Sequence, residues 1–218
     1  MVTHSVPDLL TPMPKPTEAI NKLIAVFRTA SVPLEIEEKD YVIDLQQGNS
    51  EPDVILVLDG ALNIYRTADN LRFVRASAPN LFGMQGSPFR YNLYQFRSEE
   101  GAVIEFLPYS RAVELVSEHQ LFQEVLDFQA YLSDFQAYRT NLLISKSAYQ
   151  IVCAFLIEIE MMSPEQRFNT SVFNYIHEHT HLARSGVMRI LADLRHGEYI
   201  NIENGKLIAI LKKFPREY

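Results

Sequence analysis

The 218-residue sequence contains one cysteine, no tryptophan, eight glycines and eleven prolines. Its single thiol, Cys153, excludes a disulfide framework, a cysteine-based zinc site and a cysteine-held iron–sulfur cluster, because each of these requires several thiols. The low glycine and proline counts exclude a fibrous repeat. Hydrophobic residues make up 47% of the chain and charged residues 22%, which is typical of a globular protein.

Long apolar runs are also missing. No stretch reaches the roughly 18 residues that a membrane span requires. The first residues, Met1 to His4, lack the basic and apolar regions of a signal peptide. The sequence therefore predicts a bacterial cytoplasmic protein with no membrane partner.

Positive charge is scarce overall, but it is unevenly distributed. The net charge of −7 argues by itself against a nucleic-acid partner. From Arg184 onward, however, the chain has seven Lys or Arg and four Asp or Glu, a net charge of +3. The rest of the chain carries a net charge of −10. A basic end on an acidic body favours a polyanionic partner, although a chance fluctuation would give the same count.

The chain divides into stretches with different patterns. Residues 1–31 are a proline-rich arm followed by a short helix that begins at Thr17. Residues 32–109 contain short β-rich runs separated by turns such as Asp59-Gly60, a pattern typical of an antiparallel sandwich or barrel. The clearest runs are 53–58, 61–66, 71–76 and 102–107.

Residues 110–145 predict one long helix with an apolar seam. The seam positions recur at spacings of four and three, and Arg139 is the polar member among them. We expect this seam to form a homodimer, because a lone helix after a β-domain has little surface of its own chain to cover it. The alternative is an amphipathic helix packed against its own domain. The predicted dimer-interface residues are Leu121, Val125, Phe128, Leu132, Phe135 and Leu142.

Residues 146–218 predict a winged helix-turn-helix. A helix over 147–162 comes first, and a short helix around residues 172–176 is followed by a turn at 179–182. A second helix then runs over 183–196 and is expected to end at Gly197, as a C′ glycine would end it. Asn204-Gly205 lies between two alternating strands, which is a strong hairpin signal.

The second of these helices carries residues suited to DNA. Arg184 and Arg189 can each offer two donors to a guanine, and Ser185 can donate to a base or a phosphate. Met188 lies on the same helix, and Lys206 on the wing can meet the phosphate backbone. The predicted DNA-binding residues are therefore Arg184, Ser185, Met188, Arg189 and Lys206.

These motifs resemble the cyclic-AMP receptor protein/FNR superfamily of bacterial transcription factors. The run 57–65 resembles the superfamily's strand–glycine–strand element, and 183–191 resembles its recognition helix, "S-R-E-T-V-x-R-I-L". Ala183 replaces the capping serine, and Ser185 replaces a glutamate that would read cytosine, so a different operator is expected. Within the superfamily, the chain is most similar to an enterobacterial group, IprA, named for inhibiting hydrogen peroxide resistance.

The resemblance implies an α+β fold: an N-terminal antiparallel β jelly roll like a cyclic-nucleotide-binding domain, a long dimerisation helix, and a C-terminal winged helix-turn-helix. It also implies where an effector would sit. Met84 stands where the superfamily's ribose-binding carboxylate should be. Arg90 is the candidate phosphate ligand, but Tyr91 and Asn92 follow it, and Tyr91 would partly fill the cavity. We therefore expect a degenerate pocket without a cyclic nucleotide, and no cofactor.

No metal site is expected either. None of the six histidines lies in the β-rich section, and only His177 and His181 of the alternating triplet 177, 179 and 181 share a helical face. Histidines in a turn or at a helix end beside a phosphate backbone are the favoured interpretation. Cys153 lies in an apolar run, which predicts a buried, unreactive thiol.

The hypothesis from sequence is a homodimeric, sequence-specific DNA-binding transcriptional regulator, connected through its resemblance to oxidative-stress tolerance. Repression by occlusion and activation through RNA polymerase both stay open. The alternative is a sensor or protein-interaction module whose winged helix binds a protein instead of DNA. An enzyme is not expected, because no catalytic constellation or phosphate loop stands out.

Overall fold

The structure, a computed structural model, describes residues 14–36, 40–44, 51–85 and 93–215. The chain forms two compact units, one of Lys15–Leu132 and one that contains Ser133–Tyr218. Each unit has its own apolar clusters. In the described segments, no helix combines the length and apolarity that crossing a membrane requires.

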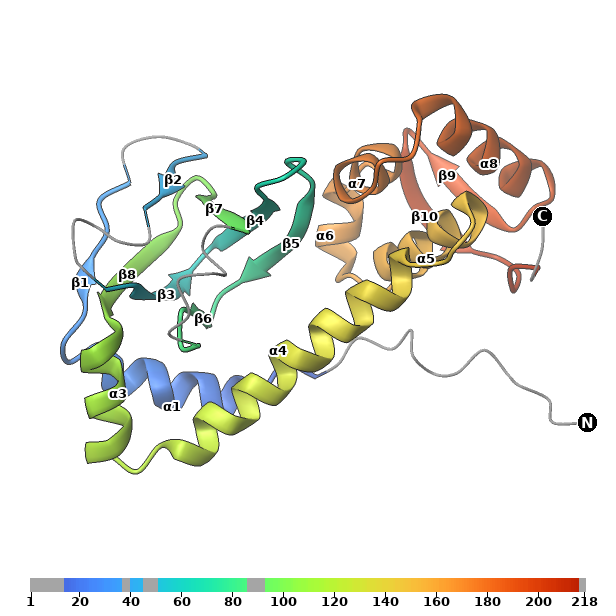
Figure 1. Ribbon diagram of the computed structural model, residues 1–218. Helices are drawn as coiled ribbons and strands as arrows, with labels where there is room; N and C mark the ends of the chain where they lie inside the picture. Colours follow the sequence, from blue (N-terminus) through green and yellow to red (C-terminus); the bar gives the residue numbers. More distant parts are fainter. Residues whose placement is uncertain (1–13, 37–39, 45–50, 86–92, 216–218) are drawn as a thin grey trace, which may run out of the picture. The chain divides into compact units, whose positions relative to one another are not determined.

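The first unit contains two antiparallel sheets, as the short alternating runs predicted (Figure 1). One sheet has the strand order β1-β8-β3-β6 and the other β2-β7-β4-β5. The first sheet consists of β1 (Val32–Pro33), β8 (Val103–Pro108), β3 (Asp53–Asp59) and β6 (Asn80–Phe82), and the second of β2 (Val42–Ile43), β7 (Tyr94–Ser98), β4 (Ala61–Arg66) and β5 (Arg72–Ser77).

Residues of both sheets share one apolar core. Leu62 and Ile64 of β4 are buried in a cluster with Phe96 of β7 and Ile104 of β8. Asn63, between the first two in sequence, makes polar contacts with other side chains instead. Because Asn63 is also buried, the side chains of β4 alternate in polarity and not in exposure.

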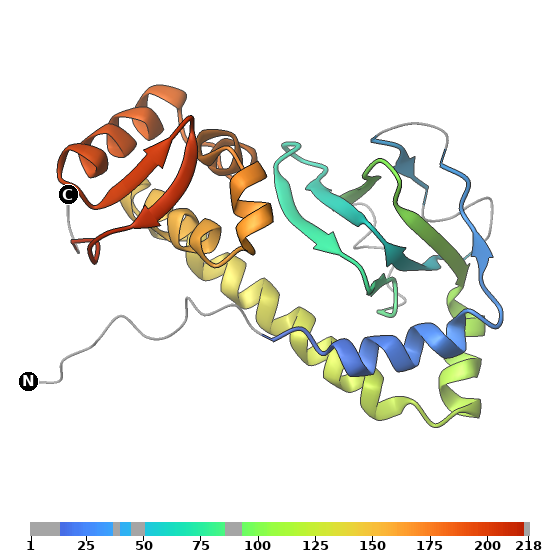
Figure 2. The same cartoon turned by 180° about the vertical axis from the view of Figure 1, so that it is seen from behind.

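Helices cover a second cluster in the same unit. The helix α1 (Thr17–Phe27) packs against α3 (Tyr109–Glu118), and the start of α4 (Phe122–Leu143) joins them (Figures 1 and 2). Leu23, Leu115 and Phe128 are buried there. The sandwich thus rests on a helical layer that includes the first turns of the longest helix.

The prediction of one continuous helix over 110–145 is wrong. The segment forms two helices, α3 and α4, separated at residues 119–121. Gln120 adopts a left-handed conformation with φ of 56°, and the Leu121 N–H bonds to the Val116 carbonyl at 2.9 Å. Left-handed residues commonly end helices, but they are usually glycines, so Gln120 gave no signal in the sequence.

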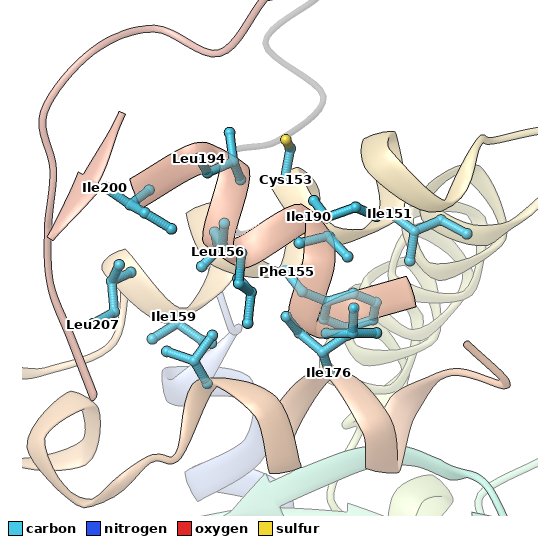
Figure 3. Close-up of a cluster of buried hydrophobic side chains, with 14 of the residues drawn as sticks. Ile151, Cys153, Phe155, Leu156, Ile159, Ile176, Ile190, Leu194, Ile200 and Leu207 are labelled. Atoms are coloured by element: carbon cyan, nitrogen blue, oxygen red, sulfur yellow. The ribbon is translucent and has the colours of Figure 1, made fainter. Parts of the chain in front are cut away.

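The second unit is a winged helix-turn-helix, as predicted. Its helices are built around one apolar cluster (Figure 3), in which Phe155, Ile159 and Ile176 are fully buried. Side chains of Ser147, Ser163 and Ser171 cap the starts of three helices. The elements are α5 (Ala148–Glu160), α6 (Pro164–Asn169), α7 (Val172–His179), α8 (Arg184–His196), β9 (Ile200–Glu203) and β10 (Lys206–Ile210).

The wing is the hairpin β9–β10, which lies beside α8 (Figure 2). Its turn residues Asn204 and Gly205 both have positive φ, 49° and 77°, as an Asn-Gly hairpin turn requires. The prediction for Gly197 is wrong in one respect. The helix ends there, but Gly197 has φ of −75° and Glu198 is the left-handed residue. Gly197 has a different role: a Cβ atom there would lie 2.7 Å from the Tyr199 ring.

Candidate nucleic-acid interface

The helix α8 has one face in the core and one in solvent. Its buried residues are Val187, Ile190, Leu191 and Leu194, which pack into the cluster shared with α5 and α7. Their spacing of three and four holds a single side of the helix against the domain. The opposite side therefore stays exposed, and it includes four of the residues predicted to bind DNA: Arg184, Ser185, Met188 and Arg189.

The exposed side of α8 carries a net positive charge from three arginines and one aspartate, Asp193. Arg184, Arg189 and Arg195 all lie on it, and none has an ion pair with another described residue. Arg184 and Arg195 are separated by about three helical turns and share one edge of this side, whereas Arg189 lies toward the other edge. The smaller residues Ser185 and Ala192 lie between these edges. We call Arg184, Ser185, Met188, Arg189, Ala192 and Arg195 the α8 face.

Arg184 is not simply a solvated cation. Its guanidinium carbon lies 4.6 Å from the ring centroid of Phe173, on α7. The His177 ring stacks on the same phenylalanine, with centroids 5.4 Å apart and 15° between the planes. No pattern in the sequence predicted this contact. The i, i+4 spacing of Phe173 and His177 was visible, but their meeting with Arg184 crosses the turn between two helices.

The wing lysines have partners within the chain. Lys206 Nζ donates to the Asn169 carbonyl at 2.9 Å. Lys212 Nζ donates to the Gly197 carbonyl at 3.3 Å and forms an ion pair with Glu198 at 3.2 Å. Lys206, predicted to bind DNA, is therefore tied to the end of α6, and this contact would compete with a phosphate for one of its donors.

The three alternating histidines lie in different environments. His177 and His181 are exposed, but His179 is buried against Phe155 and Tyr175, and its Nδ1 lies 2.7 Å from the Tyr175 carbonyl oxygen. His179 is thus a core residue, contrary to its placement with the other two beside a phosphate backbone. No cluster of metal-ligating side chains occurs among the residues that the structure describes.

The start of α8 lacks a side-chain cap, as the alanine at this position predicted. Ala183 is the N-cap residue and supplies no hydrogen bond from its side chain to the first turn. The starts of α5, α6 and α7 are capped by serines. The backbone N–H groups of the first turn of α8 therefore have no side-chain acceptor from the cap position.

The predicted dimer seam lies largely on the inner side of α4. Phe128 is 0% exposed within its own chain, and Leu142 is also buried. Leu121, Val125 and Leu132 are partly buried against the helical cluster of the first unit, and Phe135 is half-buried. Phe128 and Leu142 therefore have no surface to offer a second copy, which fits the alternative of a helix packed against its own domain.

A different side of α4 is exposed. Phe122 and Leu126 are 59% and 62% exposed, which is unusual for large apolar side chains. The exposed positions continue along the helix at spacings of three and four, and small residues lie in the middle. We call this set the α4 outer face: Phe122, Leu126, Ala130, Ser133, Ala137, Thr140 and, just beyond the helix, Ile144.

Arg139, the polar member of the predicted seam, faces the winged helix. It is only 3% exposed, and its Nη1 lies 3.3 Å from both carboxylate oxygens of Glu158 on α5. Its guanidinium carbon also lies 5.3 Å from the Phe155 ring centroid. Burial raises the pKa of the Glu158 carboxyl, and the charge of Arg139 and a hydrogen bond from Tyr175 oppose this rise.

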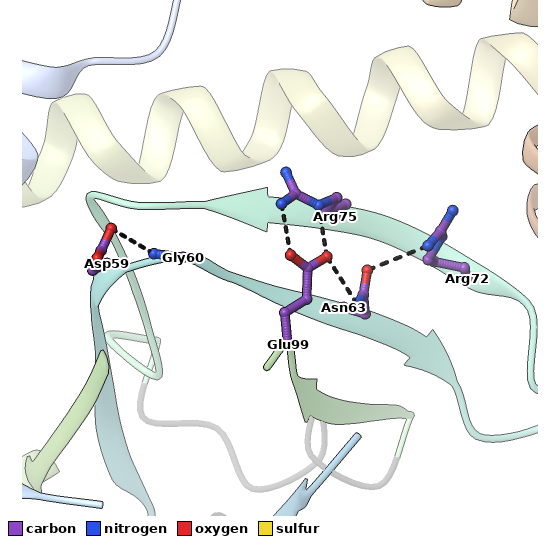
Figure 4. Close-up of polar contacts among 6 residues, drawn as sticks. All are labelled: Asp59, Gly60, Asn63, Arg72, Arg75 and Glu99. Atoms are coloured by element: carbon purple, nitrogen blue, oxygen red, sulfur yellow. Dashed lines mark hydrogen bonds and ion pairs between the residues drawn. The ribbon is translucent and has the colours of Figure 1, made fainter. Parts of the chain in front are cut away.

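The β-sandwich carries a polar network on β4, β5 and the end of β7 (Figure 4). Arg75 makes a two-bond pair with Glu99, with both distances 2.6 Å. Asn63 donates to Glu99 at 3.3 Å and accepts from Arg72 at 3.4 Å. Asn63 is itself buried, and the charge of Glu99 is matched by Arg75.

The region predicted to correspond to an effector pocket is described only as far as Gln85. Met84 is buried in the cluster that includes Leu81 and Phe128. Arg90, Tyr91 and Asn92 lie outside the described residues. Cys153 is buried in the winged helix, and burial raises the pKa of its thiol to about 11. The prediction of a buried thiol is confirmed.

Comparisons with known proteins agree with this architecture. A family described as "Winged helix-turn-helix DNA binding" matches residues 148–216. A protein of Escherichia coli K12, the "Inhibitor of hydrogen peroxide resistance", is 28% identical over 205 residues, which cover 94% of this chain and 98% of that protein.

Solved structures show the same fold at lower identity. FixK2 from Bradyrhizobium japonicum is 19% identical with a TM-score of 0.59, and the match covers 83% of this chain and 93% of that one. A regulator of the CRP/FNR family from Eubacterium rectale is 15% identical with a TM-score of 0.58, and the match covers 88% and 90%. The expected fold, antiparallel sheets, a long helix and a winged helix-turn-helix, is thereby confirmed.

Proposed function

We propose that this chain, which has the fold of the CRP/FNR regulators, is a sequence-specific DNA-binding transcriptional regulator. The observation that carries the proposal is the α8 face, where three arginines without ion pairs among the described residues lie on the exposed side of the second helix of a helix-turn-helix. In this motif the second helix enters the major groove and presents its N-terminal residues to base edges.

The residue types of the α8 face match the chemistry of the groove. Arg184 and Arg189 would each donate two hydrogen bonds to O6 and N7 of a guanine. Ser185 would donate to a base or a phosphate, and Met188 would pack against a thymine methyl group. Lys206 would reach a phosphate only by sharing its donors with Asn169. The uncapped N–H groups at the start of α8 would favour a neighbouring phosphate.

We further propose that two copies pair through the α4 outer face rather than through the seam predicted from sequence. Large apolar side chains stand at both ends of this face, and Ala130, Ser133 and Ala137 in its middle would let two helix backbones approach closely. Pairing would cover Phe122 and Leu126, whose exposure is otherwise costly. A two-fold dimer would place two α8 helices on the two half-sites of a palindrome.

A charge on the α4 outer face tests the pairing. Leu126→Glu should raise the dimer dissociation constant by at least about tenfold, because it would bury a carboxylate without a partner. Asn174→Asp, exposed on α7 instead of α4, adds the same charge and should leave the constant unchanged. Sedimentation equilibrium measures both. Equal dissociation constants for the two variants would reject this interface.

The sandwich would not take a cyclic nucleotide as an effector. Met84 contributes an apolar thioether where a ribose-binding carboxylate is expected, and it is buried among apolar neighbours. A thioether is a weak hydrogen-bond acceptor. Isothermal titration with cyclic AMP should therefore give no heat of binding at micromolar concentrations, and a measurable affinity would contradict the degenerate pocket.

The cellular role follows from the curated relative. A protein 28% identical over nearly the whole chain is named for inhibiting resistance to hydrogen peroxide. We infer that the present chain regulates genes of oxidative-stress tolerance in the bacterial cytoplasm, either by occluding promoters or by contacting RNA polymerase. Deletion of its gene should change survival of hydrogen peroxide, and unchanged survival would reject this role.

Selection of genomic DNA fragments by the purified full-length protein tests the proposed function directly. We expect enrichment of a palindrome whose half-sites are one helical turn apart, bound with an affinity that falls steeply as salt rises. Two results together would favour the alternative of a protein-interaction module. The purified chain would enrich no DNA sequence, and it would capture one protein in stoichiometric amounts from a bacterial lysate.

A further inference from the structure

We infer that Phe173, on α7, is a positioning residue for DNA recognition, because its ring holds the Arg184 guanidinium in the orientation that a base edge requires. The inference rests on the proposed function and deepens it, since it names a residue that determines specificity without touching DNA. It begins from the 4.6 Å distance between the Arg184 guanidinium carbon and the Phe173 ring centroid.

The geometry leaves the arginine able to read a base. A cation–π contact uses the flat face of the guanidinium, whereas the five N–H donors point outward along its edges. Arg184 makes no hydrogen bond or ion pair to any other described residue. The ring of Phe173 can therefore restrain the guanidinium plane while the donors remain free for O6 and N7 of a guanine.

The Phe173 ring serves as a platform for Arg184, and the helix that carries it is anchored in the core. Val172 and Ile176, which flank Phe173 on α7, are 1% and 0% exposed, so α7 is fixed in the core. The Thr180 hydroxyl donates to the Ile176 carbonyl at 2.8 Å and accepts from the Leu182 N–H at 3.4 Å. These bonds hold the turn that leads to Arg184, so the phenylalanine ring and the arginine backbone keep a defined relation.

His177 adds a second ring to the platform. It lies one helical turn after Phe173, and the two planes are nearly parallel at 15°. An aromatic neighbour limits rotation of the phenylalanine ring. Without the platform, a long arginine side chain would lose several rotamers on binding DNA, and that entropy cost would reduce affinity.

The Phe173 side chain is suited to hold a guanidinium as well as to pack against the apolar cluster. It is only half-buried and packs at the margin of the apolar cluster. An aliphatic side chain would fill a similar space there but would offer no π face. Specificity for one guanine should therefore depend on the ring and not merely on an apolar side chain at position 173.

A double-mutant cycle in DNA binding tests the inference. The variants are Phe173→Leu, Arg184→Ala and the double variant, and the probe is the best palindrome from the genomic selection, with the guanine assigned to Arg184 either present or replaced. Fluorescence anisotropy gives the dissociation constants, and thermal melting and sedimentation check that each variant is folded and keeps the wild-type oligomeric state.

The expected result is a loss that depends on Arg184. Phe173→Leu should weaken binding to the guanine-containing site by roughly 2- to 30-fold, the range of one cation–π contact. The same substitution should have no effect in the Arg184→Ala background, or on the site without that guanine. Phe173→Tyr keeps the π face and should bind as the wild type does, and His177→Leu should give a smaller loss in the same direction.

Four outcomes would overturn the inference. Equal losses from Phe173→Leu with and without Arg184 would indicate a general structural role, and so would equal losses from Phe173→Leu and Phe173→Tyr. No loss from Phe173→Leu would show that the ring does not position Arg184. Absence of any DNA binding by the wild type would overturn the proposed function itself, and this inference with it.

Discussion

Three arginines of the sandwich unit and the three arginines of the α8 face differ in their partners. In the sandwich unit, Arg28, Arg75 and Arg111 each lie within 3.1 Å of a glutamate oxygen, so the charges are balanced locally. On the α8 face, the arginines have no ion pair with any described residue. A net charge of −7 therefore does not exclude a cationic surface, because the charges of the three arginines on the α8 face are not balanced by ion pairs with described residues.

Arg139 lies in the same unit as the α8 face but behaves like the arginines of the sandwich. It is buried, pairs with Glu158 and joins the end of α4 to α5. Membership of a unit therefore does not separate the two kinds of arginine. An arginine with a carboxylate partner stabilises the fold, and an exposed arginine without one remains available to a ligand.

Removal of Arg139 should give the largest loss of stability. Arg139→Met should lower the free energy of unfolding by about 3–5 kcal/mol, because it leaves the largely buried Glu158 carboxylate with its Tyr175 hydrogen bond but without its cationic partner. Arg75→Ala breaks an exposed pair and should cost less than about 1 kcal/mol. Urea unfolding measures both, and similar losses would remove the distinction between buried and exposed pairs.

The same variant has a pH signature. Loss of Arg139 should raise the pKa of Glu158 further, since the arginine opposes the effect of burial. A carboxyl with a raised folded-state pKa binds its proton more tightly in the folded protein, so the stability of Arg139→Met should recover as the pH falls through that pKa. The difference in unfolding free energy between Arg139→Met and the wild type should therefore shrink between pH 8 and pH 5. A constant difference over this range would contradict this explanation.

The reactivity of the Cys153 thiol tests whether a buried group is protected from a reagent in solution. Its thiol pKa of about 11 leaves about one molecule in ten thousand as thiolate at pH 7. We expect its reaction with a disulfide reagent to be slower in the native protein than in urea by about two orders of magnitude or more. A reaction equally fast in both conditions would show that the thiol is accessible and would revive a redox role.

Lys15 should affect stability only at alkaline pH. Its ammonium donates to the Ser77 carbonyl at 2.7 Å, and burial lowers its pKa to about 8. The folded protein then binds this proton less tightly than the unfolded chain, so stability should increase from about pH 8 to pH 10.5. Lys15→Met should lack this increase in a series of urea titrations, and an identical pH slope would contradict the shift.

Sequence patterns predicted the parts of the fold that local rules control. Asn204-Gly205 defined the wing turn, and the apolar stripe of α8 predicted which side is buried and so where Arg184 and Arg189 are exposed. Alternation similarly predicted strands such as β4. Each of these features depends on spacing within one element, which the sequence displays directly.

Features that depend on contacts between elements were missed. The seam on α4 contained the right periodicity, but spacing cannot tell which apolar side meets its own domain. Phe128 turned out to be buried and Leu126 exposed. The contacts of Arg139 with Glu158 and of Arg184 with Phe173 join residues on different helices. The helix break at Gln120 occurs at a left-handed residue that is not a glycine, so no sequence signal predicted it.

The most direct test is the affinity of the full-length protein for its selected palindrome after removal of arginines from each unit. We predict that Arg184→Ala with Arg189→Ala lowers the affinity by at least about 30-fold, the loss of two guanine contacts at the lower end of their range. Arg75→Ala, which removes one positive charge from the sandwich, should change the affinity less than about twofold. Wild-type affinity in the double variant, with its oligomeric state intact, would contradict the claim that the α8 face reads DNA.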